Sequence, residues 1–489
     1  MPDSISSQPV GASAARATAT SPGRHALIMV GTLVVAIAAY WYTRSAVPEL
    51  AARTLAIFII AAVFWAAEVL PLFATAFVVL GLNIVFLASD GGLADQLTRF
   101  LLWLGLSVRQ SPEVLPAPAS VYLPLAKDII LLFMGGFLLS AALTKHGIDQ
   151  VIASTVLRPF TRSPLWLLYG VLGISAFFSM WMSNTATAAM MIAIISPMLH
   201  RLSPDERFRS ALVLAVPFGA NIGGTGTPIG TPPNAIAYGA LHAAGYHITF
   251  LKWVLVATPL AVLLLAGVGL LLYAFFRPSP GLSVGALEPA GALSARGKVT
   301  LMILGATVLL WLTSGQHGLS AGATALLAAG ALTALRVLDR RDVDSIDWDV
   351  IILMWGGLSL GIAMQQSGLI GYVGQADLTT LPGGTWGVAL VIALLGVSVS
   401  TFMSNTATAA LLVPMALALS IPGKEQFAML AALACSFAMA MPVSTPPNAM
   451  AYATGEIGVR EMIRTGGLIS ISAVVLMLLG YQIMIPLVF

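Results

Sequence analysis

The octapeptide MSNTATAA occurs twice in this chain, at 182–189 and at 403–410, and each copy lies within a long apolar stretch. Three small polar residues in a row are tolerated at membrane depth only where they are buried in protein or line a wet cavity. The identity of all eight residues shows that the two copies did not arise by chance. The chain therefore has to form two such polar sites.

The duplication extends well beyond the octapeptide. A Gly-Gly pair precedes each copy at the same spacing, from Gly135 to Ser183 and from Gly356 to Ser404. A second pair of motifs follows in the same order: GTPPNAIAY at 230–238 and STPPNAMAY at 444–452. The sequence thus contains an internal repeat.

Composition places the repeat in a membrane. The chain has 489 residues, of which 58% are hydrophobic and 9% are charged, whereas soluble domains are about 25% charged. Its single cysteine, Cys435, excludes an internal disulfide framework and a cysteine metal cluster. The net charge of +3 gives no reason to expect a nucleic-acid partner.

We expect an all-α polytopic protein with eleven crossings and two re-entrant hairpins at 164–200 and 385–421. Each hairpin arm has only about 15–18 apolar residues, which is short for a span of ~30 Å. The expected crossings are 26–43, 54–70, 72–89, 128–145, 209–241 (broken), 251–276, 299–315, 319–336, 349–366, 426–455 (broken) and 463–487.

Charge gives the orientation in the plasma (inner) membrane. With the amino terminus in the cytoplasm, about sixteen of the 23 Lys and Arg fall inside, as the positive-inside rule requires. The connection 90–127 lies outside, and LADQLTRFLLWLGL within it suits an amphipathic surface helix. The expected organisation is a disordered cytoplasmic tail (1–25), a first transmembrane helix (26–53), repeat 1 (54–277), a cytoplasmic linker (278–298) and repeat 2 (299–489).

Equivalent points of the two halves are separated by an odd number of crossings, so the halves face opposite ways. Inverted repeats with interrupted helices at matching positions indicate a secondary transporter whose substrate binds near the bilayer midplane.

The motifs offer neutral groups for ions. Ser183, Asn184 and Thr185 lie where one hairpin arm ends and the next begins, and such residues are good helix N-caps. A helix start carries a partial positive charge and binds anions, while the free carbonyls of the preceding arm suit a cation. Thr231-Pro232-Pro233-Asn234 likewise predicts the start of a half-helix, because proline is favoured at the first helical position.

GANIGGTGTPIG (219–230) is expected to be too Gly-rich to continue as a regular helix. With 445–448 repeating the second motif, four half-helix starts are available to converge on one site. These motifs contain no Lys, Arg, His, Asp or Glu. Proton coupling usually needs an ionisable residue in the pathway, so Na⁺ is the favoured coupling ion.

At these residues the chain resembles the divalent anion/sodium symporter family of dicarboxylate, citrate and sulfate carriers. The doubled SNTATAA, TPIGTPPNAIAYG, STPPNAMAYATG, AEVLPLFATAFVVL and WDVIILMWGGLSLGIAMQQSGL carry the likeness over nearly the whole chain. The resemblance implies a homodimer. In each protomer a mobile part, with both hairpins and both broken helices, would move across the membrane against a scaffold like an elevator.

The resemblance also implies residue roles. It implies substrate carboxylates held by Asn184, Thr185, Thr231, Pro232, Asn405, Thr406, Thr445 and Pro446. One sodium site is implied at Ser179, Ser183, Asn184 and the backbone of Gly230. A second is implied at Ser400, Asn405 and the backbones of Met403 and Ser444. No transition metal and no cofactor are expected.

We therefore predict a sodium-coupled importer of C4-dicarboxylates such as succinate, malate or fumarate, and not an enzyme. Alternatives are a sodium-independent exchanger, a citrate or sulfate carrier of the same family and, more distantly, an ion channel. An intramembrane enzyme would need a nucleophile, acid or metal set in the core, and the sequence offers none.

Overall fold

The computed structural model describes residues 22–88, 119–282, 284–285, 291–373, 380, 382–419, 421–483 and 485. The predicted disordered tail falls mainly on 1–21, outside these residues, and so do 89–118 of the outer connection with its amphipathic segment. Within the described residues every assigned element is a helix.

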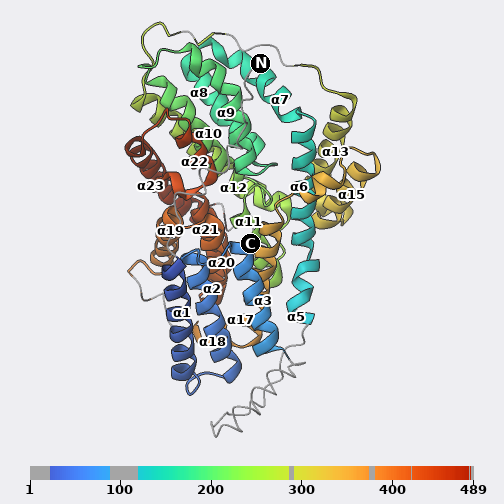
Figure 1. Ribbon diagram of the computed structural model, residues 1–489, viewed down its shortest axis with the longest axis vertical. Coiled ribbons are helices and arrows are strands. Elements are labelled where there is room, and N and C mark those ends of the chain that lie inside the picture. Colours follow the sequence, from blue (N-terminus) through green and yellow to red (C-terminus); the bar gives the residue numbers. More distant parts are fainter. Residues whose placement is uncertain are drawn as a thin grey trace, which may run out of the picture.

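The described residues of the first half form nine principal helices, with shorter turns between them (Figure 1). They are α1 (Pro22–Thr43), α2 (Glu49–Ala66), α3 (Leu72–Leu87), α6 (Asp128–Lys145), α7 (Ile148–Leu157), α8 (Pro164–Ser179), α9 (Asn184–Arg201), α10 (Phe208–Gly224) and α11 (Pro232–Ala243). The short elements are α5 (Ala119–Tyr122), η2 (Leu123–Ala126) and η3 (Arg158–Arg162).

The remaining helices repeat this order after α12 (Phe250–Phe275). They are α13 (Ala295–Leu312), α14 (Ser314–His317), α15 (Ala321–Ala334), α16 (Arg340–Asp344), α17 (Trp348–Gln366), α18 (Leu369–Val373), α19 (Thr385–Phe402), α20 (Asn405–Ala418), α21 (Lys424–Ser436), η5 (Pro442–Ser444), α22 (Pro446–Ala453) and α23 (Val459–Ile483). A helix or helix pair therefore occupies each predicted crossing and each hairpin.

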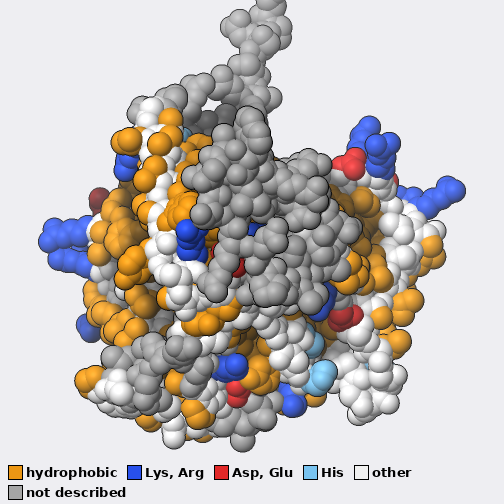
Figure 2. Space-filling view, turned by 90° about the horizontal axis from the view of Figure 1, so that it is seen from below, with side chains coloured by type: hydrophobic (Ala, Val, Ile, Leu, Met, Phe, Trp, Pro, Cys, Tyr) orange, Lys and Arg blue, Asp and Glu red, His pale blue; other side chains and the backbone are white. Residues whose placement is uncertain are grey.

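The surface is that of an integral multi-pass membrane protein. Eight of the described helices are long and apolar enough to cross a bilayer, and α3, α8, α15 and α20 are shorter apolar helices. Leu309, Ile471 and Leu270 expose 65%, 64% and 62% of their side chains, far more than large apolar residues of a soluble core. Figure 2 shows hydrophobic side chains over much of one end of the molecule, with Lys and Arg projecting at its margin.

The two halves are interlocked. α3 of the first half packs along α17 of the second, and α15 of the second packs along α6 of the first. A Cβ added to Gly135 would lie 2.5 Å from the Ala325 Cβ, and one added to Gly356 would lie 2.6 Å from the Ala76 Cβ. The first glycine of each Gly-Gly pair thus lets a helix of the other half approach closely, and the repeat is visible in the packing itself.

The two broken helices run antiparallel. The start of α10 meets the end of α22, where the Arg209 guanidinium forms an ion pair with Glu456 and the Ser210 hydroxyl donates to the Glu456 carbonyl at 3.0 Å. At the opposite end, the Tyr246 hydroxyl donates to Glu425 at the start of α21. In Figure 1, α8, α9 and α10 lie at the upper end, α2, α3 and α17 lie at the lower end, and α11, α12 and α21 lie between them.

One local expectation is wrong in part. The expected interruption over 219–230 is present only from Thr225 onward, because α10 continues regularly through Gly224. A Cβ on Gly219 would lie 2.6 Å from the Leu172 carbonyl of α8, and one on Gly223 would overlap the Ala176 backbone. These glycines serve close helix–helix contact, and the break begins only at Thr225.

Candidate functional site

The first hairpin tip joins α8 to α9. Ser183 occupies the N-cap of α9, and its hydroxyl accepts a bond from the Ala186 N–H at 3.2 Å. The Ser179 hydroxyl donates to Asn184 Oδ1 at 2.6 Å, which fixes the amide across the tip. The Thr227 hydroxyl, in the broken crossing, donates to the Met180 carbonyl at 2.6 Å and ties that loop to the tip.

The second tip repeats this geometry. The Ser400 hydroxyl lies 2.6 Å from Asn405 Oδ1 and also donates to the Cys435 carbonyl at 2.8 Å. Ser404 is the N-cap residue of α20, but its hydroxyl makes no capping bond. The Ser444 hydroxyl donates to the Thr401 carbonyl at 2.9 Å. Each tip is therefore tied to the break of its own half.

The asparagine of each TPPN motif stabilises the break. The Asn234 side-chain amide donates to the carbonyls of Gly224, Thr225 and Thr227 at 3.2, 3.0 and 2.8 Å. The Asn448 amide donates to the carbonyls of Met439 and Met441 at 3.3 and 3.0 Å. These carbonyls lose their helical partners at the break and would be costly to leave unpaired in an apolar interior.

Asn221, which sequence reasoning did not select, connects the two halves. Its Oδ1 accepts from the Asn184 amide at 3.4 Å, and its Nδ2 donates to Thr445 Oγ1 and Asn448 Oδ1, both at 3.1 Å. The side chain is fully buried. A run of hydrogen bonds therefore leads from the first tip to the half-helix start of the other repeat. A lone asparagine in an otherwise apolar helix face was the available signal.

Oxygen atoms converge beside the first tip. A Cβ on Gly230 would lie 2.8 Å from the Ser179 carbonyl, and one on Gly224 would lie 2.5 Å from Asn184 Oδ1 and 3.1 Å from the Gly230 carbonyl. A side chain at either glycine would overlap these carbonyl and amide oxygens, which belong to the class of ligand that hard cations prefer. The structure thus brings the predicted residues Ser179, Asn184 and Gly230 close together.

The predicted substrate residues differ in exposure. Thr231 and Thr445 are buried, Asn184 and Asn405 are half-buried at the tips, and Thr185 is exposed. Pro446 is exposed, while Pro232 and Thr406 are half-buried. Thr445 caps α22 by accepting from the Asn448 N–H at 3.3 Å, whereas the Thr231 hydroxyl makes no capping bond.

The residues joined by these bonds carry no formal charge. Among the described residues, no group of three or more His, Cys, Asp or Glu side chains could hold a metal ion. Asp128, the first residue of α6, accepts from the Gly322 N–H at 3.0 Å and from the Ser320 hydroxyl, so it anchors α15. The groups available at this site are therefore helix N-termini, which can bind an anion, and neutral oxygen atoms, which can bind a cation.

Known proteins share this organisation. Residues 24–488 match the profile of the sodium:sulfate symporter transmembrane region. The sodium-dependent dicarboxylate transporter SdcS of Staphylococcus aureus (strain USA300) is 31% identical over 75% of this chain and 78% of its own length. An uncharacterized transporter of Haemophilus influenzae is 31% identical over 73% of this chain and 81% of its own length.

Two solved transporters share the fold. YdaH of Alcanivorax borkumensis is 12% identical, with a TM-score of 0.51 over 87% of this chain and 97% of that chain. MtrF of Neisseria gonorrhoeae is 11% identical, with a TM-score of 0.53 over 86% of this chain and 96% of that chain. The chain belongs to the sodium:sulfate symporter family, the divalent anion/sodium symporters, and is a membrane transporter rather than an enzyme.

Proposed function

We propose that this transporter imports C4-dicarboxylates such as succinate, malate or fumarate together with Na⁺. The observation that carries the proposal is the paired tip geometry. In each half a serine hydroxyl holds an asparagine Oδ1 at 2.6 Å beside the start of a helix. Two such starts can each receive one carboxylate, because helix N-termini bind anions without formal charge.

Sodium coupling follows from the oxygen cluster beside the first tip. Carbonyl and amide oxygens of Ser179, Asn184, Gly224 and Gly230 lie close together beside the first tip, and a cation that they bound would lie next to the substrate position. The charge of Na⁺ would offset part of the cost of carrying a dianion into the membrane. The relatives named sodium-dependent dicarboxylate transporters support this assignment.

We propose an elevator motion and a homodimer as the mechanism. α8–α12 and α19–α23 would form the mobile part, which the Asn221 bonds and the Arg209–Glu456 pair hold together. α1–α3, α6, α13, α15 and α17 would form the scaffold, which the close contacts at Gly135 and Gly356 hold together. These bonds and close contacts support a division of the chain into two internally bonded groups.

Labelled succinate uptake into proteoliposomes tests the proposal. We expect an inward Na⁺ gradient to drive uptake and unlabelled malate and fumarate to compete. Exchange driven by internal dicarboxylate without Na⁺ dependence would make the protein an exchanger, and competition by citrate or sulfate alone would reassign the substrate.

The tips are tested separately. Asn184→Ala and Asn405→Ala should each abolish uptake while the protein remains folded and monodisperse, because each removes an amide at a helix start. Unchanged uptake in both variants would remove the tips from the site.

A further inference from the structure

A cavity of about 140 Å³, partly open to the surroundings, lies away from the hairpin tips. It is bounded by α11 and α20 on one side and by α17 and α18 on the other. Leu417 in its wall stands twelve residues after Asn405, which is roughly 18 Å along α20. The cavity therefore lies away from the hairpin tips, and Ile236 in its wall follows Asn234 of the first TPPN motif by two residues.

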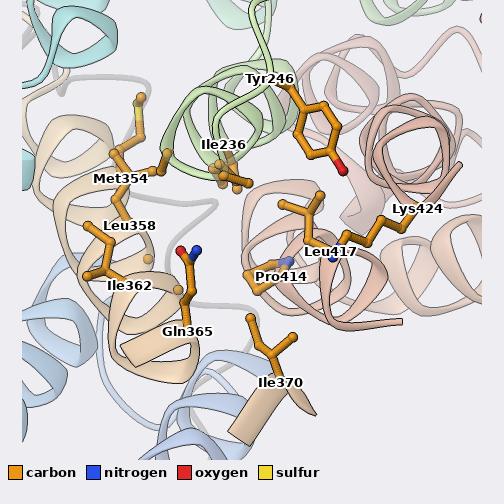
Figure 3. Close-up of a pocket in the computed structure, with 15 residues that line it drawn as sticks. Ile236, Tyr246, Met354, Leu358, Ile362, Gln365, Ile370, Pro414, Leu417 and Lys424 are labelled. Carbon is orange, nitrogen blue, oxygen red and sulfur yellow. The ribbon is translucent and has the colours of Figure 1, made fainter. Parts of the chain in front are cut away.

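The cavity wall is apolar with a polar end. Twelve of its fifteen lining residues are Ile, Leu, Met, Ala, Gly or Pro, and the other three are Tyr246, Gln365 and Lys424. Figure 3 shows the Lys424 ammonium and the Gln365 amide pointing into the space. The Tyr246 hydroxyl is engaged with Glu425.

Lys424 is the charged residue of this lining. Among the described residues, no carboxylate forms an ion pair with it and no acceptor binds its ammonium. The residue is half-buried. A half-buried ammonium beside an apolar cavity is complementary to a ligand with an anionic head and a hydrocarbon chain.

Two glycines of α17, Gly357 and Gly361, make the cavity deeper because they carry no side chain. A Cβ placed on Gly357 or Gly361 would meet no atom within 4 Å, in contrast to the close contact at Gly356. An acyl chain can lie against this bare stretch of helix, because nothing else fills it. The cavity therefore differs from the interlocked face of the same helix.

We propose that this cavity binds a single-chain anionic amphiphile, whose carboxylate or phosphate head pairs with Lys424 and whose chain lies along α17. Because the ligand touches α11 and α20 as well as α17, it bridges the proposed mobile part and the proposed scaffold. In that respect the proposal rests on the proposed function: a bound chain would slow the movement of one part past the other and so inhibit uptake.

Photo-labelling tests the site without any transport assay, so its outcome is independent of the dicarboxylate proposal. The full chain in phosphatidylcholine nanodiscs is irradiated with a palmitate analogue that carries a mid-chain diazirine, and labelled peptides are found by mass spectrometry. We expect labels on α11, α17 or α20. Palmitate and lysophosphatidate should both compete if the anionic head is the shared determinant, whereas competition by one of them identifies the preferred head.

Matched variants decide the outcome. Gly361→Leu should fill the cavity and abolish labelling, while Gly305→Leu, on an exposed and open face of α13, should not. Lys424→Gln should weaken apparent probe affinity about tenfold, the effect of one hydrogen bond to a charged group.

Three results would overturn the proposal: equal labelling of Gly361→Leu, loss of labelling in Gly305→Leu, or equal labelling by the fatty alcohol that lacks the charge. Butyrate, which has the charge without the chain, should not compete, and competition by it would likewise contradict a site for an amphiphile.

Discussion

Replacing Asn221 with Ala should weaken substrate binding by breaking the bridge between the halves. The wild-type side chain donates to Thr445 Oγ1 and Asn448 Oδ1 at 3.1 Å and accepts from the Asn184 amide at 3.4 Å. Alanine removes all three bonds. Asn184 at the first tip and Thr445 at the start of α22 are then no longer held by the same side chain, although neither residue is itself changed.

The magnitude follows from the bond lengths. Two bonds of ordinary length are worth about 1 kcal/mol each, and the longer third bond is worth less. If the whole loss of about 2 kcal/mol destabilises the arrangement that binds substrate, the half-saturating substrate concentration rises about 30-fold. Asn221→Asp should be at least as harmful, because it keeps the acceptor, loses both donations and adds a carboxylate near a dianion's path.

The repeat supplies a matched control. Cys435 stands thirteen residues before Asn448, as Asn221 stands thirteen residues before Asn234. Its backbone carbonyl, not its thiol, accepts from Ser400. Cys435→Ala should therefore leave the half-saturating concentration within about threefold of wild type, since only a buried sulfur is lost.

The assay is initial-rate succinate uptake over a range of succinate and Na⁺ concentrations, with thermal unfolding of the purified variants as a check on folding. Unchanged affinity in a folded Asn221→Ala protein would refute the bridge. An equal loss in Cys435→Ala would show that packing, rather than the amide bonds, matters at this level of the site.

Three further changes test the packing, the cation cluster and the asymmetry of the repeat. Gly356→Ala should destabilise the protein by about 1–3 kcal/mol because its Cβ would overlap α3. Gly357→Ala, which has open space around it, should leave stability unchanged. Equal melting temperatures for the two variants would contradict the close packing of α17 against α3. Gly230→Ala should raise the half-saturating Na⁺ concentration about tenfold by crowding the carbonyl cluster, and unaltered Na⁺ dependence would place the cation elsewhere. The buried Asn234 Oδ1 has no hydrogen-bond partner, whereas its counterpart Asn448 Oδ1 accepts from Asn221. Cys435→Asn should supply the missing donor to Asn234 and raise thermal stability by about 1 kcal/mol. A lower melting temperature would contradict this.

Much of the fold could be predicted because membrane helices are specified locally. Apolar length and the positions of Pro and Gly predicted the segments in which the described residues form helices, and the duplicated letters paired the halves. The error at 219–224 has a physical cause. Glycine breaks an isolated helix, but where α8 lies against it, a glycine inside a helix allows contact that no other residue permits.

The site was only partly predictable. SNT and TPPN are recognisable because both occur twice, so repetition itself drew attention to their polar residues. Asn221 is not repeated, because the equivalent position in the second half is Cys435. A search for residues shared by the two halves therefore does not find it. Two of its three partners, Thr445 and Asn448, lie in the other half, more than two hundred residues away, and no local pattern encodes such a contact.

The same asymmetry bears on the two proposed cation positions. Counting back from the TPPN motifs, the counterparts of Gly224 and Gly230 are Ala438 and Ser444. The second half therefore carries side chains at two positions where a Cβ in the first half would overlap neighbouring oxygen atoms. The Ser444 hydroxyl is already bonded to the Thr401 carbonyl, and Ser400 is shared between Asn405 and the Cys435 carbonyl.

A cation at the second position must displace or share these bonds, whereas at the first it meets converging oxygens directly. We therefore expect the first position to bind Na⁺ more tightly. On this reasoning Gly230→Ala should shift the high-affinity phase of Na⁺ activation about tenfold to higher Na⁺ concentration and leave the low-affinity phase unchanged, whereas Ser400→Ala should weaken the low-affinity phase alone. A loss of both phases in either variant would mean that the two positions fill as one unit, and the difference between the halves would then have no bearing on coupling.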